Sequence, residues 1–123
     1  MKKKLILLGV FAALMLTNTA FAATSSATIG VNDTYATGSI VQMNGTIAVS
    51  GKNNAVSTER LWVELYKDDS TFWSYDTRID GALLPVNSTA SYKSSVSSYN
   101  YYVWLDPDGP NHTGCSGNGS AVN

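Results

Sequence analysis

Alternation of apolar and polar residues with a period of two runs from residue 41 to residue 50 and limits what this chain can fold into. One side of the segment carries Val41, Met43, Gly45, Ile47 and Val49. This period is typical of a half-buried β-strand. Asn44-Gly45 is also a strong hairpin dipeptide, but a two-residue turn there would mix polar and apolar side chains on each face. We therefore predict one strand, with Gly45 as a bend or close-approach site.

The same alternation returns in residues 61–67, where Leu61, Val63 and Leu65 alternate with Trp62, Glu64 and Tyr66. A short polar turn, Asp68-Asp69-Ser70, separates this segment from the aromatic and β-branched residues 71–79. This arrangement predicts a hairpin, with Lys67 opposite Thr71, that ends at Asp80-Gly81. In that register the inward side chains are Leu61, Val63, Leu65, Trp73, Tyr75, Tyr101 and Val103.

Several shorter segments complete the expected strand set. Residues 23–27 form a small polar lead-in, predicted to be a flexible arm, and residues 28–31 start a first strand. Residues 51–54 and 106–111 read as turns because Gly, Asn, Asp and Pro dominate them. Residues 88–96 are Ser-rich and predict a weak edge strand, whereas residues 99–105 predict a strong one. The Gly/Ser/Asn-rich residues 114–123 are either a loose tail or a short last strand.

Six to seven short strands with regular turn signals predict an all-β protein, a small antiparallel β-sandwich. The segment Tyr99-x-Tyr101-x-Val103 resembles the penultimate strand of immunoglobulin-like and fibronectin-type sandwiches, which often begins with Tyr. The resemblance covers about a dozen residues and implies an immunoglobulin-like or fibronectin-like architecture. It implies no function, because unrelated functions share this fold.

The first 22 residues have the three parts of a secretory signal peptide. Lys2-Lys3-Lys4 form a basic start, Leu5 to Leu16 are almost purely apolar, and Ala20-Phe21-Ala22 supply small residues at the cleavage positions. Cleavage after Ala22 leaves 101 of the 123 residues, divided into a domain at 23–113 and the segment 114–123. The compact, Lys-rich form is typical of bacteria. We expect a secreted, extracellular protein, with the cell wall or periplasm as alternative locations.

The charge of the remaining chain is acidic. The signal segment contains three of the eight Lys and Arg residues, so five remain against nine Asp and Glu residues, which gives −4. Nucleic-acid phosphates require clustered Lys and Arg, and an anionic membrane surface requires the same. The sequence therefore predicts neither nucleic acid nor membrane as a partner of the mature protein.

Aromatic residues gather on the outward side of the predicted sheet. With Glu64, that side is expected to carry Trp62, Tyr66, Phe72, Tyr102 and Trp104. A clustered aromatic surface of this size marks a binding site, because flat rings stack on sugars and anchor protein interfaces. We predict these five aromatic residues as a ligand-binding site for a glycan or a protein surface. The alternatives are rings covered by the tail, a loop or a second copy, or a register shifted by one.

No catalytic or metal-binding signature accompanies this face. Asp106, Asp108 and Asn111 are spaced like calcium ligands, but the further acidic ligands of such loops are missing and a plain turn explains them. His112 and Cys115 are the only His and Cys of the mature chain, fewer than a zinc site needs. We expect no metal, no cofactor and no enzymatic activity, and Cys115 is expected in a flexible tail.

The leading hypothesis is therefore a secreted, non-enzymatic binding domain that acts through its aromatic face. A second hypothesis is a small secreted antimicrobial or toxin-like protein. A third is a structural envelope protein that self-assembles through its strands or through an intermolecular Cys115 disulfide. The sequence leaves the oligomeric state open.

Overall fold

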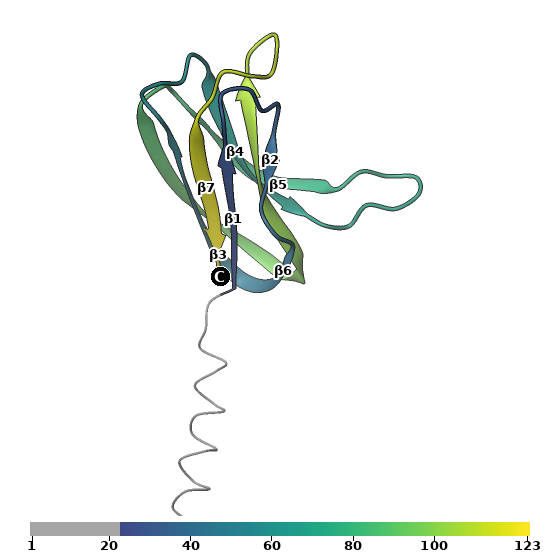
Figure 1. Cartoon of the computed structure of the whole chain (residues 1–123). Helices are drawn as coiled ribbons and strands as arrows, with labels where there is room; N and C mark the ends of the chain where they lie inside the picture. The colour runs from purple at the N-terminus through teal and green to yellow at the C-terminus, as the bar shows by residue number, and fades with distance from the viewer. Residues whose placement is uncertain (1–22) are drawn as a thin grey trace, which may run out of the picture.

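The computed structural model describes residues 23–123 (Figure 1); the predicted signal peptide, residues 1–22, lies outside the described residues. Every element of the described part is a strand, and all strands pair antiparallel in one seven-stranded sheet. The all-β, antiparallel fold class predicted from the sequence is confirmed. The strands are β1 (Thr24–Ile29), β2 (Ala36–Thr37), β3 (Val41–Asn53), β4 (Arg60–Lys67), β5 (Thr77–Leu84), β6 (Ser88–Asp108) and β7 (Gly117–Val122).

The sheet order is β1-β7-β3-β6-β4-β5, with β2 beside the end of β6. The first part of β6 pairs with β3, and its last part, from Tyr101 on, pairs with β4. The sheet folds over at this long strand, so that its two halves enclose a shared core (Figure 1). Hydrogen bonds join the halves: Asn53 Nδ2 on β3 donates to the Leu84 carbonyl on β5, at 3.1 Å, and the Val103 amide donates to Ser25 Oγ, also at 3.1 Å.

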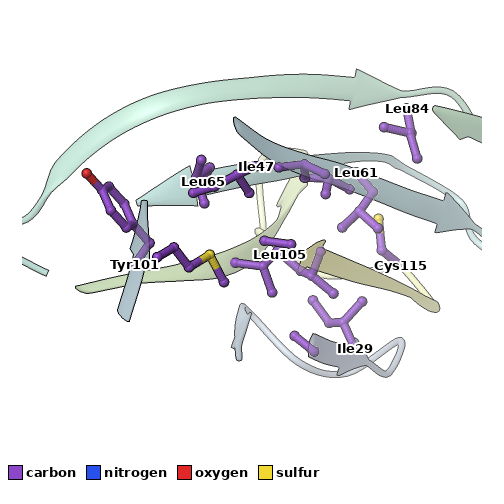
Figure 2. Close-up of a cluster of buried hydrophobic side chains, with 14 residues drawn as sticks. Ile29, Ile47, Leu61, Leu65, Leu84, Tyr101, Leu105 and Cys115 are labelled. Carbon is purple, nitrogen blue, oxygen red and sulfur yellow. The ribbon is translucent and has the colours of Figure 1, made fainter. Parts of the chain in front are cut away.

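The core consists of the inward side chains of both halves (Figure 2). Its largest fully buried apolar members are Ile29, Met43, Ile47, Val49, Leu61, Val63, Leu65, Leu84, Tyr101, Val103 and Leu105. Burying one such side chain stabilises the fold by about 2 kcal/mol. The side chains of residues 61–67 and 99–105 that the sequence predicts to point inward are buried in this core.

The single strand predicted through Asn44-Gly45 is confirmed, because β3 continues across this dipeptide. Gly45 has a φ of 89°, and a β-bulge interrupts the register between Met43 and Gly45. The side chain of Asn123 satisfies the backbone groups that the bulge frees. Its Oδ1 accepts from the Asn44 amide at 2.9 Å, and its Nδ2 donates to the Asn44 and Thr46 carbonyls. The loop predicted at 51–54 is wrong, since β3 extends to Asn53 opposite β7.

The hairpin register predicted for residues 61–79 is wrong. Lys67 pairs with Thr77, not Thr71, so residues 68–76 form a loop and β5 runs through Asp80-Gly81 to Leu84. Asp69 and Asp76 hold this loop closed by accepting hydrogen bonds from the backbone amides of Thr77 and Ser70. These Asp side chains supply local hydrogen bonds that compete with a strand ladder. Trp73 and Tyr75, predicted to point inward, are therefore exposed.

Both ends of the described chain are paired strands. The lead-in predicted to be flexible belongs to β1, where Thr24 lies opposite Val122 of β7. Residues 114–123 contain β7, which lies between β1 and β3. The segments 88–96 and 99–105 are one strand, β6, although residues 88–99 pair on one side only within the described chain, as an edge does. Cys115 is fully buried (Figure 2), not placed in a flexible tail.

Candidate binding site

Four of the five predicted site residues share the outer face of β4 and β6. Tyr66 lies opposite Tyr102 in the antiparallel register, and Trp104 lies opposite Glu64. Side chains alternate across a strand, so Trp62 and Tyr66 point away from the core that receives Leu61, Val63 and Leu65. These four rings therefore lie on the side of the sheet that the sequence predicts.

The rings on this face pack against one another. Tyr66 stacks on Tyr102 with ring centres 5.8 Å apart, and Trp104 lies 5.6 Å from Tyr66. Tyr35, which precedes β2 and was not predicted as a site residue, stacks on Trp104 at 5.0 Å and 14°. The face is consequently less exposed than expected: Tyr102 is 6% exposed, and Tyr66 and Trp104 are half-buried. Stacked rings offer a ligand fewer free faces than an open aromatic platform.

Trp62 at the other end of the face is also partly covered. The Arg78 guanidinium lies 5.3 Å from its ring centre, within the range of a cation–π interaction. The same guanidinium forms an ion pair and hydrogen bond with Glu64. Burial raises the pKa of Glu64, and the Arg78 partner opposes that rise. Both contacts of the Arg78 guanidinium are therefore with side chains of β4, not with the loop before β5.

The fifth predicted residue, Phe72, lies away from the other four in the loop between β4 and β5. Figure 1 shows this hairpin extending away from the rest of the molecule. Phe72 and Trp73 are each 89% exposed and Tyr75 is 95% exposed. We call these three residues the aromatic tip. The rings of Phe72 and Trp73 contact each other edge to face, with centres 4.7 Å apart and planes at 77°.

Hydrogen bonds below the tip fix the shape of its loop. Asp76 Oδ1 accepts from the Ser70 amide at 2.8 Å, and Asp69 Oδ1 accepts from the Thr77 amide at 3.0 Å. Thr71 and Ser74 exchange backbone hydrogen bonds across the tip and join their hydroxyls at 2.9 Å. The aromatic side chains are thus exposed on an ordered turn.

A hollow lies between the sheet face and the base of this loop. It has a volume of about 300 Å³ and is lined by Tyr35, Thr37, Gly38, Ile40, Asp76, Tyr102 and Trp104. The Tyr102 hydroxyl donates to Asp76 Oδ2 at 2.6 Å. This hydrogen bond is the main cause that lowers the pKa of Asp76 below its ordinary value of 3.8. Burial, together with this bond to a carboxylate, raises the pKa of Tyr102, which remains a neutral donor.

The residues weighed for calcium and zinc are engaged in other contacts. Asp108 forms an ion pair with Arg60 at 2.7 Å, and Asp106 lies 4.0 Å from His112 Nδ1. The Cys115 thiol donates to the Glu59 and Arg60 carbonyls. Burial raises the pKa of Cys115 to about 11. Residues 23–123 contain no group of three or more His, Cys, Asp or Glu side chains arranged to hold a metal ion.

Sequence reasoning missed Trp73, Tyr75, Tyr35 and Asp76 as surface residues of interest. One available signal was the position of the rings at 72, 73 and 75, which does not follow the alternation of a strand. A second was the pair of Asp residues that bracket this run, since Asp favours turns by bonding nearby backbone amides. For Tyr35 the sequence gave no signal, because its contact with Trp104 depends on the position of β2.

No protein-family model matches the chain, and no curated protein matches it either. Among solved structures, the chain is similar to the Yersinia pseudotuberculosis-derived mitogen, with 13% sequence identity and a TM-score of 0.45. The likeness covers 84% of this chain and 85% of that chain. Within residues 23–123, no helix is long and apolar enough to span a bilayer.

Proposed function

We propose that this chain is a secreted, non-enzymatic binding protein that acts outside the cell and attaches to a partner protein through its aromatic tip. The observation that carries the proposal is the exposure of Phe72, Trp73 and Tyr75, at 89%, 89% and 95%. Secretion is supported by the signal-peptide pattern of residues 1–22.

Three adjacent aromatic side chains in water are unfavourable unless a ligand covers them, because transfer of apolar surface from water stabilises a complex by about 25 cal/mol per Å². Trp and Tyr are also the side chains that most often dominate the free energy of protein association. The hydrogen bonds of Asp69 and Asp76 hold the loop before binding. Less conformational entropy is then lost when a partner covers the tip.

The charge around the tip favours a protein partner over a membrane. Residues 68–76 include three carboxylates, Asp68, Asp69 and Asp76, and no Lys or Arg. Anionic lipid surfaces attract basic segments and repel acidic ones. An apolar pocket with a basic rim on a protein satisfies both the rings and the carboxylates.

The ring geometry favours a protein over a glycan. Sugar rings stack on free, flat aromatic faces. The planes of Phe72 and Trp73 lie at 77° to each other, and on the sheet Tyr66 already stacks on Tyr102. The Phe72–Trp73 pair offers no coplanar platform, and the Tyr66–Tyr102 stack leaves fewer ring faces free for a sugar. A protein pocket can enclose rings in this edge-to-face geometry.

Photo-crosslinking tests the proposal directly. A benzophenone side chain at position 72 is illuminated with extracellular proteins, and excess unlabelled protein competes for the partner. We expect a saturable crosslink that wild type competes away and a Phe72→Ser/Trp73→Ser double variant does not. The matched control is Val56→Ser, which removes an apolar side chain that is 70% exposed on another turn.

Parallel binding assays distinguish the other ligand classes. Retention on insoluble cell-wall polysaccharide that the double variant loses would assign the tip to a carbohydrate. Co-sedimentation with phosphatidylcholine vesicles that the double variant loses would assign it to a membrane. Either result, without a protein crosslink, would overturn the proposal.

A further inference from the structure

The hollow beside the loop combines aromatic walls with a fixed carboxylate. Asp76 stands at one side, where its Oδ1 accepts from the Ser70 amide and its Oδ2 accepts from the Tyr102 hydroxyl. Tyr35 is 55% exposed and lines the hollow together with Trp104. A ligand in the hollow would therefore meet ring surface and negative charge together.

The negative charge of Asp76 has no counter-ion in the described chain. Across residues 23–123, no Lys, Arg or His nitrogen lies within 4.0 Å of this carboxylate. The two cationic side chains nearest in sequence have other partners. Lys67 lies 3.9 Å from Asp69 and 4.4 Å from the ring centre of Tyr99, whereas Arg78 pairs with Glu64. The nearby Asp68 adds further negative potential at Tyr102.

Rings combined with an unpaired carboxylate attract a cation. An ammonium or guanidinium over an aromatic face is attracted by the charge distribution of the ring, and a charge-assisted hydrogen bond to a carboxylate adds to this attraction. A guanidinium fits both parts best, because it is planar, stacks on rings and donates two parallel hydrogen bonds to one carboxylate. A hollow of about 300 Å³ is at the small end of ligand pockets, which suits one side chain.

We propose that this hollow binds the guanidinium of an arginine on the partner protein, stacked against the exposed ring of Tyr35, which itself lies on Trp104, and hydrogen-bonded to Asp76. The inference rests on the proposed function for the origin of the arginine, and it specifies the partner: an arginine lies beside the pocket that receives the aromatic tip. The two contacts are adjacent because Asp76 closes the loop that carries Tyr75.

The test measures arginine binding without the unidentified partner. Protein expressed from its full chain and processed is titrated with N-acetyl-arginine methylamide. The chain has three Trp residues, so the three indole N–H signals in a nitrogen–proton NMR spectrum can be assigned by single Trp→Phe substitutions. We expect a saturable shift of the Trp104 signal and none of the Trp73 signal. The citrulline analogue has nearly the same shape without the charge and is expected to give no shift.

Two variants and two controls complete the test. Asp76→Asn removes the charge but keeps an acceptor for the Ser70 amide, and we expect it to weaken binding about tenfold or more. Tyr35→Leu removes exposed ring surface and is expected to weaken arginine binding while leaving the fold intact. If Asp76→Asn does not fold, wild-type binding by Tyr35→Leu would overturn the cation site. Asp108→Asn, which removes a carboxylate at the C-terminal end of β6 that does not line the hollow, and Val56→Ser, at an exposed turn, are expected to bind as wild type does.

The outcomes separate this inference from the proposed function. No shift of Trp104, an equal shift with citrulline, or wild-type binding by a folded Asp76→Asn variant would overturn the cation site. Stronger binding of the matching lysine analogue would overturn the assignment to arginine. Because Phe72 and Trp73 do not line the hollow, these results leave the tip crosslink unaffected. Arginine binding without any tip crosslink would instead overturn the proposed function and retain the site.

Discussion

Gly45 allows β3 to bend without ending. Its positive φ of 89° is a conformation that side chains with a Cβ atom rarely adopt. A Cβ added at this position would have no heavy atom within 4 Å. The need for glycine is therefore conformational and not a matter of space.

We predict that Gly45→Ala lowers the free energy of unfolding by about 1–2 kcal/mol, because the alanine must hold an unfavourable φ at the bulge. Gly45→Asn should lose less, since asparagine adopts positive φ more readily. Urea denaturation followed by circular dichroism measures both. Equal stability of wild type and the alanine variant would contradict this account of the bulge.

The environment of Cys115 disfavours the thiolate, the reactive form of its side chain. Its sulfur is buried and donates to two carbonyls, and its pKa is raised to about 11. The thiolate is the reactive form of cysteine, so we predict that a thiol reagent at pH 7.5 modifies the native protein far more slowly than the protein in urea. We also predict a monomeric mass after non-reducing electrophoresis. Rapid native modification or a disulfide-linked dimer would instead support assembly through Cys115.

The β4–β5 loop owes its shape to side chains at its base. Asp76 connects the loop to the sheet through Tyr102, and this hydrogen bond is the main cause of its lowered pKa. A carboxyl whose pKa is lower in the folded protein stabilises the fold. Its contribution is complete above the ordinary pKa of 3.8 and disappears as the pH falls through the lower folded value.

We predict that Tyr102→Phe raises the pKa of Asp76 towards 3.8, because the phenol that stabilises the carboxylate is gone. Carboxyl carbon NMR shifts measured from pH 2 to pH 6 report this pKa directly. The stability lost by wild type below pH 4 should then be smaller in the variant. Tyr99→Phe, at an exposed tyrosine of the same strand, is the control and should leave the Asp76 titration unchanged. An unchanged pKa in Tyr102→Phe would contradict the assigned cause.

Strands with a clear period of two could be predicted from the sequence, and loops held by side-chain hydrogen bonds could not. The alternation in 41–50 correctly outweighed the turn signal of Asn44-Gly45, since burial of one face decides the register. In residues 68–79, strand propensity favours a hairpin that begins to pair at Thr71. Asp69 and Asp76 instead form hydrogen bonds with the loop backbone, so pairing begins at Thr77. The predicted site is split for the same reason. Tyr66, Tyr102 and Trp104 lie on the sheet as predicted, whereas Phe72 lies at the tip of the loop.

At the scale of the whole molecule, β6 makes the two halves one unit. Its first part pairs with β3 and its last part with β4, and the core receives side chains from both halves. Neither half can bury its apolar face without the other. The shapes of the β4–β5 loop and of the outer face therefore depend on packing far from them.

We predict that this dependence makes unfolding a single transition. Ile47→Ala in β3 removes a fully buried side chain and should lower the free energy of unfolding by about 3 kcal/mol. The loss should appear equally in far-ultraviolet circular dichroism and in the indole NMR signal of Trp104, which lies on the outer face of the other half. Val56→Ala, at a site 70% exposed, should change stability by less than about 0.5 kcal/mol. Two separate transitions, or a Trp104 signal that outlasts the circular dichroism change, would show that the half around β4 folds independently of β3.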